Sequence, residues 1–475
     1  MGSKWPEFRL DEITTLIIDC PHSTPEWTDS GVIVLRSNNI RNGSLDLTNP
    51  SFTTEEGYLD RIKRAIPTAD DIVLTREAPM GEVCIIPKGL KCCLGQRMVL
   101  IRADKTQVIP EYLLYAIQSS YIQNQISWNE GTGTTVSNIR IPNIKALKIP
   151  LPSLNIQRGI VSNLLSVDKK ISLNIATNQT LEQMSQTLFK SWFVDFDPVI
   201  DNALDAGNPI PEALRSRAEL RQKVRNSADF KPLPGNIRAL FPTEFEEMEL
   251  SLIPKGWKFS NVGSLLKNTI GGDWGSDSED EKHTTQAMIV RGTDIPELIS
   301  GKLSSAPYRW VEPKKLEKRR INVGDIIIEV SGGSPTQSTG RSIFMTEQII
   351  DRLGGVVEPA SFCRKFEPLS VELGLIISLH LSKIYNDGKM WEYQNQSTGI
   401  ANFQTKYFLE AEQIVIPSAQ VINAFYRIVM PWIDKSHNNE QIILGNLRDT
   451  LLPKLISGEL SLEDLPNLAN QTEPA

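Results

Sequence analysis

Residues 174–198 read NIATNQTLEQMSQTLFKSWFVDFDP, which is typical of a long polar helix that ends in a cluster of aromatic side chains. A related stretch near the C-terminus, residues 438–460, reads NNEQIILGNLRDTLLPKLISGEL. Each of the two stretches follows a region of short β-branched runs. The sequence therefore indicates one structural unit, a β-rich part followed by a long helix, present twice.

Internal similarity supports a tandem duplication, and the matching segments occur in the same order in both halves. KWPEFRLDEI from residue 4 matches KGWKFSNVGSLL from residue 255, and VIVLRSNNI (32–40) matches AMIVRGTDI (287–295). ADDIVLTREAPMGEVCIIP (69–87) matches VGDIIIEVSGGSPTQSTGRSIFM (323–345) in its Asp, apolar strand and loop. GTGTTVSNIRIPNIKALKIPLP (131–152) matches STGIANFQTKYFLEAEQIVIPS (397–418). The second match places Arg36 over Arg291.

Each copy is predicted to be a mixed, largely β globule. Short β-branched runs bounded by Gly, Pro, Asn and Asp predict strands at 32–35, 72–75, 83–86 and 98–101. Helical spacing of apolar residues predicts helices at 112–121 and 373–384. The long helices are expected at 153–195 and 418–460, so that the first globule covers 1–152 and the second 255–417.

The two long helices carry a coiled-coil seam of apolar residues at alternating steps of three and four. Helices of about 40 residues extend ~60 Å, so each needs a partner for its apolar stripe, and the economical partner is the other copy. Asn174, Asn178 and Ser185 interrupt the seam and would fix its register. Ordinary helix packing inside one compact domain is the alternative. The seam or partner-docking residues are predicted to be Ile160, Leu164, Ile171, Leu181, Leu188, Trp192, Phe193, Val429, Ile433, Leu447, Leu451 and Leu455.

Between the copies, residues 196–254 are predicted to be a linker that lets the chain run back along the first helix. It contains a charged helical piece at 211–226 and proline-rich joints. Residues 461–475 are expected to be a flexible tail. Trp192 and Phe193, at the end of the first helix, either lock the helix to a globule or contact a partner subunit.

Composition bounds the class of protein. A chain of 475 residues with 40% hydrophobic and 23% charged residues is typical of a globular protein with two to four domains. No run of 18 apolar residues occurs, and the five cysteines form no C-x-x-C, which predicts reduced thiols in a cytoplasmic protein. The net charge of −7 counts against a simple nucleic-acid binder, although a basic cleft can lie on an acidic body.

Catalytic motifs are missing from the sequence. There is no P-loop, no N-P-P-[FY] or D-P-P-[FY] motif, and no convincing Ser-His-Asp or Cys-His arrangement among four scattered histidines. The GTGTT at residue 131 does not follow a strand, and SEDEKH (278–283) is expected to be a solvated loop. The chain is therefore predicted to be non-catalytic, with no cofactor and no metal.

Polar loops at corresponding places in the two copies are the candidate functional sites. Arg, Asn and Gln side chains pair with base edges, whereas small hydroxyls, Arg and Lys suit phosphate and sugar. The ordinary solvated turn is the alternative for each loop, and the basic run EPKKLEKRR (312–320) is either a phosphate-facing helix or a solvated face. The candidate DNA contacts are Arg36, Asn38, Asn39, Arg41, Arg76, Thr134, Asn138, Arg140, Arg291, Thr293, Gln337, Arg341, Asn402 and Lys406.

The whole pattern resembles a known family. The order globule, long helix, globule, long helix resembles the specificity subunit of Type I restriction-modification systems. The segments that carry the resemblance are IPLPSLNIQRGIVSNLLSVDKKI (149–171), LFKSWFVDFDPV (188–199), LFPTEFEEMELSLIPKGW (240–257) and LRDTLLPKLISGEL (447–460). The resemblance implies an α+β fold, a pseudo-two-fold tandem repeat of two largely β target recognition domains joined by two long antiparallel coiled-coil helices.

The resemblance also implies a function and partners. Each recognition domain would read one half of an asymmetric, bipartite target in double-stranded DNA. The helices would act as a spacer and dock two methyltransferase (modification) subunits, and the assembly would recruit restriction (helicase-nuclease) subunits. Adenine methylation and ATP-dependent cleavage would belong to the complex, whose other subunits could neutralise DNA phosphates around an acidic chain. A non-catalytic coiled-coil adaptor that holds two protein-binding globules is the alternative.

The two copies differ in one loop that contains candidate DNA contacts. The second copy replaces TREAPMGEV of the first with a longer loop rich in Gly and Ser. Residue-by-residue transfer between these two loops is therefore not expected.

Overall fold

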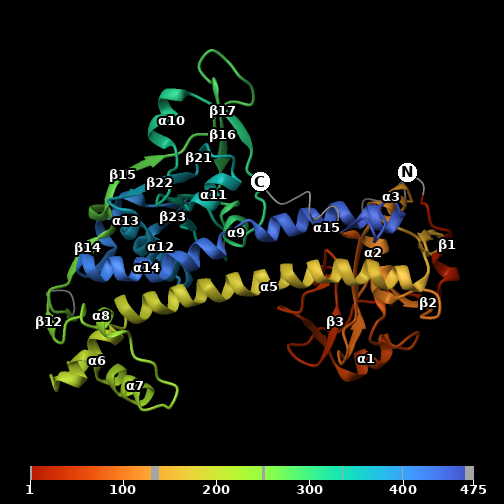
Figure 1. Cartoon of the computed structure of the whole chain (residues 1–475), viewed down its shortest axis with the longest axis horizontal. Coiled ribbons are helices and arrows are strands. Elements are labelled where there is room, and N and C mark those ends of the chain that lie inside the picture. The colour runs from red at the N-terminus through yellow and green to blue at the C-terminus, as the bar shows by residue number, and fades with distance from the viewer. Residues whose placement is uncertain (1–2, 130–137, 249–251, 335, 398–399, 466–475) are drawn as a thin grey trace. The chain divides into compact units, whose positions relative to one another are not determined.

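The computed structural model describes residues 3–129, 138–248, 252–334, 336–397 and 400–465 (Figure 1). The chain divides into two compact units. Unit 1 comprises residues 1–171 and 444–475, and unit 2 comprises residues 172–443. The 40-residue helix α5 (Leu154–Phe193) contributes its first part to unit 1 and the rest to unit 2.

Unit 1 is organised around a four-stranded antiparallel sheet in the order β2-β10-β7-β8. Its central strands are buried on both faces because alternate side chains enter different cores. Ile72 and Leu74 pack with α2, whereas Val73 between them packs with Leu35 of the neighbouring sheet. The elements of this layer are β2 (Thr14–Asp19), β7 (Ile72–Arg76), β8 (Met80–Ile85), β10 (Met98–Ala103) and α2 (Pro110–Gln118).

A second sheet of unit 1 has the order β6-β3-β9, in which β3 pairs parallel with β9. A separate strand pair, β1 with β11, joins the start of the unit to the segment that leads into α5. The remaining elements are β1 (Glu7–Arg9), β3 (Val32–Leu35), β4 (Ile40–Arg41), β5 (Ser44–Leu45), β6 (Ser51–Thr53), β9 (Cys92–Leu94), β11 (Lys148–Pro150), α1 (Glu55–Arg61), α3 (Ser120–Trp128) and α4 (Ile141–Lys145).

Unit 2 repeats this topology strand for strand. Its four-stranded sheet has the order β15-β22-β18-β20, its second sheet the order β17-β16-β21 with β16 and β21 parallel, and β14 pairs with β25 as β1 pairs with β11. The strands are β14 (Lys258–Asn261), β15 (Leu266–Gly271), β16 (Thr285–Val290), β17 (Tyr308–Val311), β18 (Ile326–Glu329), β20 (Ser342–Phe344), β21 (Val357–Pro359), β22 (Cys363–Pro368) and β25 (Gln413–Ile416). The tandem duplication predicted from the sequence is confirmed.

The Asp that precedes the central strand has the same place in both units. Asp71 accepts a hydrogen bond from the Thr68 amide at 2.8 Å, and Asp325 accepts one from the Asn322 amide at 2.7 Å. Each carboxylate is also paired with a cation, Arg102 at 2.7 Å and Lys365 at 2.9 Å. The two copies were aligned by a sequence pattern of an Asp, an apolar strand and a loop. This pattern therefore corresponds to the same structural feature in both units.

Helices and a third small sheet complete unit 2. The sheet β19-β24-β23 follows the end of the β18 strand, and α12 follows β22 and packs on β20 as α2 follows β10 and packs on β8. These elements are β19 (Ser331–Gly332), β23 (Gln394–Ser397), β24 (Ile400–Phe403), α9 (Ile295–Ile299), α10 (Pro313–Arg319), α11 (Glu347–Arg352), α12 (Val371–Asn386) and α13 (Thr405–Ala411). The four strands predicted in the first copy and the helices predicted at 112–121 and 373–384 are confirmed, with 112–121 split into α2 and α3 at Ser119.

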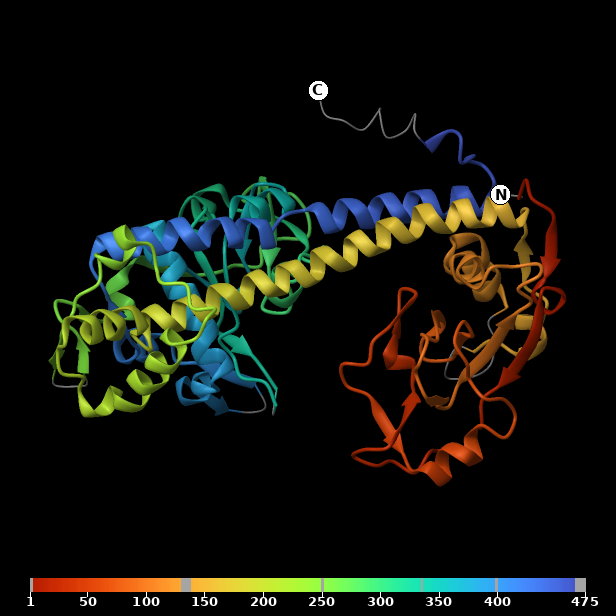
Figure 2. The same cartoon turned by 60° about the horizontal axis from the view of Figure 1, so that its bottom comes forward.

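Each unit pairs part of α5 with a helix from the end of the second copy. In unit 1, Leu164 of α5 shares a core with Leu452 of α15 (Glu440–Ser457), and Asp168 lies 3.2 Å from Arg448 (Figure 2). Because Asp168 follows Leu164 while Arg448 precedes Leu452, the two helices are antiparallel.

In unit 2, α5 pairs with α14 (Ala419–Ser436) in the same way. Phe193 of α5 packs on Phe425, with ring centroids 4.8 Å apart, and Ser185 lies near Ile433. The order of these contacts makes α5 and α14 antiparallel as well.

Most of the predicted seam is buried, but one part is displaced. Leu447 is 42% exposed, and Leu452 and Ile456 are buried in addition to the predicted Leu455. Leu451 is half-buried. The remaining seam residues are buried (Ile160, Leu164, Trp192, Phe193, Val429, Ile433 and Leu455) or half-buried (Ile171, Leu181 and Leu188).

The displacement has a physical cause. The predicted second helix is two helices, because α14 ends at Ser436 and α15 begins at Glu440. Arg352 of α11 occupies this break: it donates to Asn439 Oδ1 at 2.8 Å and to the carbonyl oxygens of His437 and Asn438. The break interrupts the helical register between Ile433 and α15. Leu447 is exposed and does not pack in the described seam, so the part of its prediction that concerns partner docking stays a prediction.

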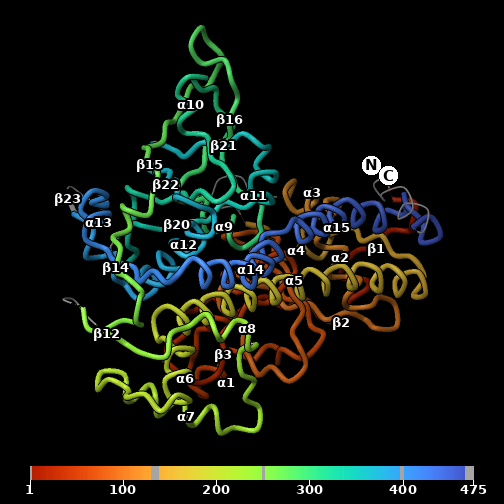
Figure 3. Tube along the Cα trace, turned by 60° about the vertical axis from the view of Figure 1, so that its left-hand side comes forward, coloured from red at the N-terminus to blue at the C-terminus, as the bar shows by residue number. Residues whose placement is uncertain are grey.

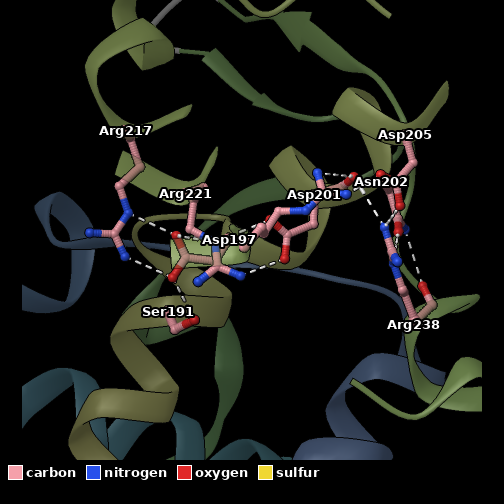
Figure 4. A network of polar contacts seen from close by, with 9 residues as sticks. Ser191, Asp197, Asp201, Asn202, Asp205, Arg217, Arg221 and Arg238 are labelled. Atoms are coloured by element: carbon pink, nitrogen blue, oxygen red, sulfur yellow. Dashed lines mark hydrogen bonds and ion pairs between the residues drawn. The ribbon is translucent and has the colours of Figure 1, made fainter. Parts of the chain in front are cut away.

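The segment between the copies contains two helices that run in the same direction and are joined by a regular set of ion pairs (Figures 3 and 4). Helix α6 (Asp197–Ala206) carries a carboxylate every fourth residue, and α7 (Arg215–Arg225) carries an arginine every fourth residue. Side chains four residues apart share a helix face, so the two rows meet. The pairs are Asp197–Arg217, Asp201–Arg221 and Asp205–Arg225, and Arg238 also reaches Asp205. The charged helix predicted at 211–226 is confirmed.

Asp197→Asn is expected to lower the free energy of unfolding of this helix pair by about 2–3 kcal/mol, because it leaves two arginines facing a group without charge. Asp197 is 3% exposed and accepts from Arg217 Nε and Nη2 at 2.7 Å and from Ser191 Oγ at 2.8 Å. Hydrogen exchange of the α6 and α7 amides measures the loss. The control is Asp205→Asn, whose side chain is 45% exposed and which should cost less than about 1 kcal/mol. Equal losses for both variants would contradict the prediction.

Candidate nucleic-acid interface

The turn after β3 contains four of the candidate contacts, and they have different roles. Asn39 is 4% exposed; its Oδ1 accepts from the Arg36 amide at 2.9 Å and its Nδ2 donates to the Asp46 carbonyl at 3.0 Å. Both the oxygen and the nitrogen of the Asn39 side-chain amide are therefore used in hydrogen bonds that stabilise the turn. Arg36, Asn38 and Arg41 are exposed, and Arg41 lies 3.5 Å from Glu82.

Arg36 lies over the ring of Trp27, with its guanidinium carbon 5.1 Å from the ring centroid. Its Nη1 is 3.4 Å from Ser51 Oγ. A stacked guanidinium keeps its N–H groups in one plane, available to an acceptor at the edge of the pair. Arg36 is thus presented to solvent in a fixed orientation.

A second group in unit 1 gathers at the end of β7. Arg76 Nη1 lies 2.6 Å from Asp19, and Arg76 Nε donates to the Ile139 carbonyl at 3.1 Å. Asn138 forms a β-bridge with Glu77, and Arg140 is exposed at the start of α4. Thr134 lies outside the described residues. The structure brings Arg76, Asn138 and Arg140 together, although they are far apart in the sequence.

In unit 2, Arg291 follows β16 as Arg36 follows β3, but its guanidinium has another partner. Arg291 binds Asp294 through Nε at 2.9 Å and Nη2 at 2.7 Å. Asp294 also accepts from the Arg291 amide at 2.8 Å, as Asn39 accepts from that of Arg36. The Asp294 carboxylate raises the pKa of Arg291 by hydrogen bonding. The turn is the same in both units, and the chemistry at its surface differs.

The remaining candidates of unit 2 lie around Glu329, at the end of β18. Arg341 binds this carboxylate through two hydrogen bonds of 2.8 and 2.6 Å. A Cβ at Gly292 would lie 2.3 Å from Glu329 Oε1, so the loop after β16 can approach only because this residue is glycine. Thr293 in that loop is exposed. The loops after β16 and β18 therefore meet at one edge of unit 2.

Three further candidates surround this edge. Gln337 Nε2 lies 3.4 Å from Tyr385 Oη, and Asn402 Oδ1 accepts from Ser331 Oγ at 2.9 Å. Lys406 is exposed in the first turn of α13. Arg76, Arg291 and Arg341 are each bound to a carboxylate, whereas Arg36, Arg41, Arg140 and Lys406 are the more accessible cations of the set. Contact of each with DNA stays a prediction.

The basic run at 312–320 forms α10, and its charges are partly paired. Arg319 lies 2.8 Å from Asp273, and Lys315 lies 2.6 Å from Glu312. Lys314 and Lys318 are exposed. The helix thus presents a mixed face, in which Lys314 and Lys318 are exposed and Lys315 and Arg319 are ion-paired. 

Metal-ligating groups and thiols are not concentrated in one place. Within the described ranges, no group of three or more His, Cys, Asp or Glu side chains could hold a metal ion. The cysteines are free and buried, and burial raises the pKa of Cys84 and Cys92 to about 12. A thiol with so high a pKa is a poor nucleophile at neutral pH. Among the described helices, none has both the length and the apolar character of a membrane span.

Sequence reasoning missed two exposed tryptophans, Trp27 and Trp274, and the arginine Arg309 that lies over the second of them. Their signal in the sequence is weak: each tryptophan is a single large aromatic in a loop of small and acidic residues, TPEWTDSG (24–31) and GGDWGSDS (271–278).

Residues 2–183 match the family model described as the Type I restriction modification DNA specificity domain. The MjaIX specificity subunit of Methanocaldococcus jannaschii is 24% identical over 416 residues, which cover 87% of this chain and 82% of that protein. The HindI specificity subunit of Haemophilus influenzae is 25% identical over 418 residues, which cover 84% of this chain and 88% of that protein.

The fold also has a solved counterpart. The Type I restriction-modification S subunit from M. genitalium superimposes with a TM-score of 0.52 at 17% identity, over 96% of each chain. Duplicated β units with an antiparallel helix pair in each, and polar loops at corresponding places, are the features of this fold. Residues 2–183 match the Type I restriction modification DNA specificity domain, and the chain as a whole is similar to Type I restriction enzyme specificity subunits along most of their length.

Proposed function

We propose that this chain reads an asymmetric, bipartite DNA target for a Type I restriction-modification complex, with one β unit for each half-site. The main support for the proposal is that the two units have the same strand order but different side chains on their loops. The two units share their strand order, yet equivalent arginines differ: Arg36 lies on Trp27, and Arg291 is bound to Asp294. One scaffold with two different sets of loops suits two different half-sites.

The helices suit the role of a spacer that fixes the distance between the half-sites. Helix α5 is continuous for 40 residues and contributes to both units. Half-site centres on one face of B-DNA fall about 34 Å apart for each helical turn, so a stiff helix can select a spacing. In this proposal residues 153–195 and 418–460 are the spacer, and 1–152 and 255–417 are the recognition domains.

Partner subunits are proposed to dock on the helices. Large apolar side chains are exposed on α5 and α15, and exposed apolar groups of this size favour a covering partner. They are Leu173 (60%), Ile175 (37%), Met184 (43%), Ile443 (63%) and Leu447 (42%). We expect two modification subunits there, with restriction subunits joining the complex. These partners would supply the catalysis, and their charges would offset the net charge of −7 of this chain.

Exchange of residues 1–152 for those of another member of the family is expected to change one half of the methylated motif and leave the other half unchanged. Methylation mapping in cells that also carry the modification subunits measures the motif. The matched exchange of residues 255–417 should change the other half only. A change of both halves, or of neither, would exclude one unit per half-site.

The adaptor alternative gives a different result in the same system. If the two β units bind proteins rather than DNA, the assembled complex will show no preference between target and scrambled duplexes in a competition experiment. A preference of at least 10-fold for one duplex is expected from the proposed function.

A further inference from the structure

An exposed tryptophan lies in the corresponding loop of both units. Trp27 lies between β2 and β3 and is 45% exposed, and Trp274 lies between β15 and β16 and is 38% exposed. Thr28 bridges Phe52 of β6, and Ser276 bridges Trp310 of β17, so both loops are attached to the same edge strand of the second sheet. The two loops therefore correspond in the fold, and the bridge of unit 2 lies two residues further along its edge strand, since Phe52 corresponds to Tyr308.

A guanidinium covers each tryptophan, but the arginine comes from a different element in each unit. Arg36 follows β3 and lies 5.1 Å from the centroid of the Trp27 ring; Arg309 belongs to β17 and lies 4.7 Å from that of Trp274. Ser51 Oγ of β6 is the atom next to Arg36 Nη1. The strand pairing makes Arg309 of β17 correspond to Thr53 of β6, two residues beyond Ser51, because Ile33 and Met288 correspond and pair with Phe52 and Tyr308. Both guanidinium groups thus lie along the same edge strand of the second sheet, at different positions.

Packing alone does not account for this recurrence. A cation over an aromatic ring at an exposed site stabilises a protein only slightly, while an exposed indole leaves a large apolar face in water. Inherited packing would have kept the arginine at the same position of the repeat, which it does not. What the two units share is the resulting arrangement, in which the apolar face of an aromatic ring lies beside a cation.

The surroundings of the pairs leave room for a ligand in unit 1. A surface hollow of about 360 Å³ is lined by Trp27, Thr28, Asp29, Arg36, Ser51 and Phe52. In unit 2, Arg309 is ion-paired with Asp277, whose side chain is 88% exposed. An anion that is bound more firmly than this exposed carboxylate could take its place on Arg309.

We propose that each Trp–Arg pair is a contact for the DNA backbone, in which the indole packs on a deoxyribose and the guanidinium donates to the adjacent phosphate. Backbone contacts position a protein on the duplex without reading its sequence, so the same pair can serve two different half-sites. This explains why the pair recurs while the neighbouring loops differ. The inference rests on the proposed function and assigns Arg36 to a phosphate rather than to a base.

The test measures affinity and motif separately, in the assembled complex of this chain with its modification subunits. Fluorescence anisotropy with target duplex is expected to show about a tenfold loss of affinity for W27A and for W274A. R36Q and R309Q should each weaken binding about five- to tenfold and reduce the slope of log affinity against log salt by about one. The methylated motif should stay the same in all four variants.

Matched controls separate these effects from general surface changes. Trp391 is 38% exposed, the same as Trp274, and no described cation lies over its ring, so W391A should bind as the parent complex does. Lys91 lies 4.7 Å from the ring of Tyr58, which is only 8% exposed, so K91Q removes a cation over a covered ring and should change nothing. W27F and W274F keep an aromatic ring and are controls for misfolding of the alanine variants. They should lose less affinity than W27A and W274A.

Two results would overturn the inference. An unchanged affinity and salt slope in the Trp and Arg variants would show that the pairs do not touch DNA, and a change in the methylated bases would show that they read sequence. The parent complex is measured first. If it shows no preference for any duplex, the proposed function is contradicted, and this result does not depend on the Trp and Arg variants.

Discussion

Replacing Trp192 with alanine is expected to lower the free energy of unfolding of unit 2 by about 3–5 kcal/mol. Trp192 is 1% exposed, and its ring lies 4.9 Å from that of Phe241 and 5.6 Å from that of Phe425. It therefore joins α5, the segment between the copies and α14 in one core. Truncation would leave a cavity among three elements that cannot collapse independently. Urea unfolding followed by hydrogen exchange of α12 and α14 measures the change.

The same experiment separates the two roles predicted for this residue. The buried position supports the role of a lock between helix and globule, and a loss below about 1 kcal/mol would contradict it. Trp391→Ala, at a 38% exposed site, is the control and should cost little. If Trp192 instead served as a partner contact, the alanine variant would keep its stability and lose affinity for the modification subunits.

Unit 2 is expected to lose about 3 kcal/mol of stability as the pH falls from about 5 to 2, because of one buried carboxylate. Glu412 is 1% exposed and accepts from His380 Nε2 at 2.8 Å and from Tyr393 Oη at 2.5 Å, with Lys389 Nζ at 2.6 Å. Burial alone would raise the pKa of Glu412, but these three hydrogen bonds outweigh it and lower the pKa to about 2. The carboxylate is thus bound more strongly in the folded state.

The sign of the pH dependence follows from that lowered pKa. The ordinary pKa of a glutamate is 4.5, so above that value the carboxylate is charged in both states and its contribution to stability is complete. As the pH falls toward 2, the unfolded chain takes up the proton first and the contribution is lost.

Acid titration of the urea midpoint checks this prediction. Glu412→Gln should be less stable than the parent at pH 7 and should show a flatter acid limb, because the titrating group is gone. Glu410→Gln, two residues away at an exposed position, is the matched control and should leave the acid limb unchanged. Parallel acid limbs for the parent and the Glu412 variant would rule out this carboxylate as the source.

Much of the fold could be predicted from sequence because its signals are local. Apolar residues at steps of three and four predicted α5, and β-branched runs between Gly, Pro and Asp predicted the central strands β7 and β10. The duplication was visible as matching segments in the same order. None of these inferences required knowledge of which residues meet in space.

The candidate site could be predicted only in part, since a sequence shows which donors are present but not what they bind. Asn39 has the chemistry of a base-reading amide, yet the turn uses both of its ends. Arg36 and Arg291 align in the repeat, yet one lies on an indole and the other on a carboxylate. Arg309 and Arg36 do not align, yet each lies over the exposed tryptophan of the corresponding loop, Trp274 and Trp27.

The sequence by itself determined that two like units follow one another and that each is joined to helices, because strand alternation and helical periodicity are written in neighbouring residues. Only the tertiary structure decided where the second helical region breaks, at the site that Arg352 fills, and which guanidinium groups face a carboxylate or an exposed ring. These outcomes depend on contacts between residues distant in the chain, and burial and ion pairing are properties of such contacts, not of the local pattern.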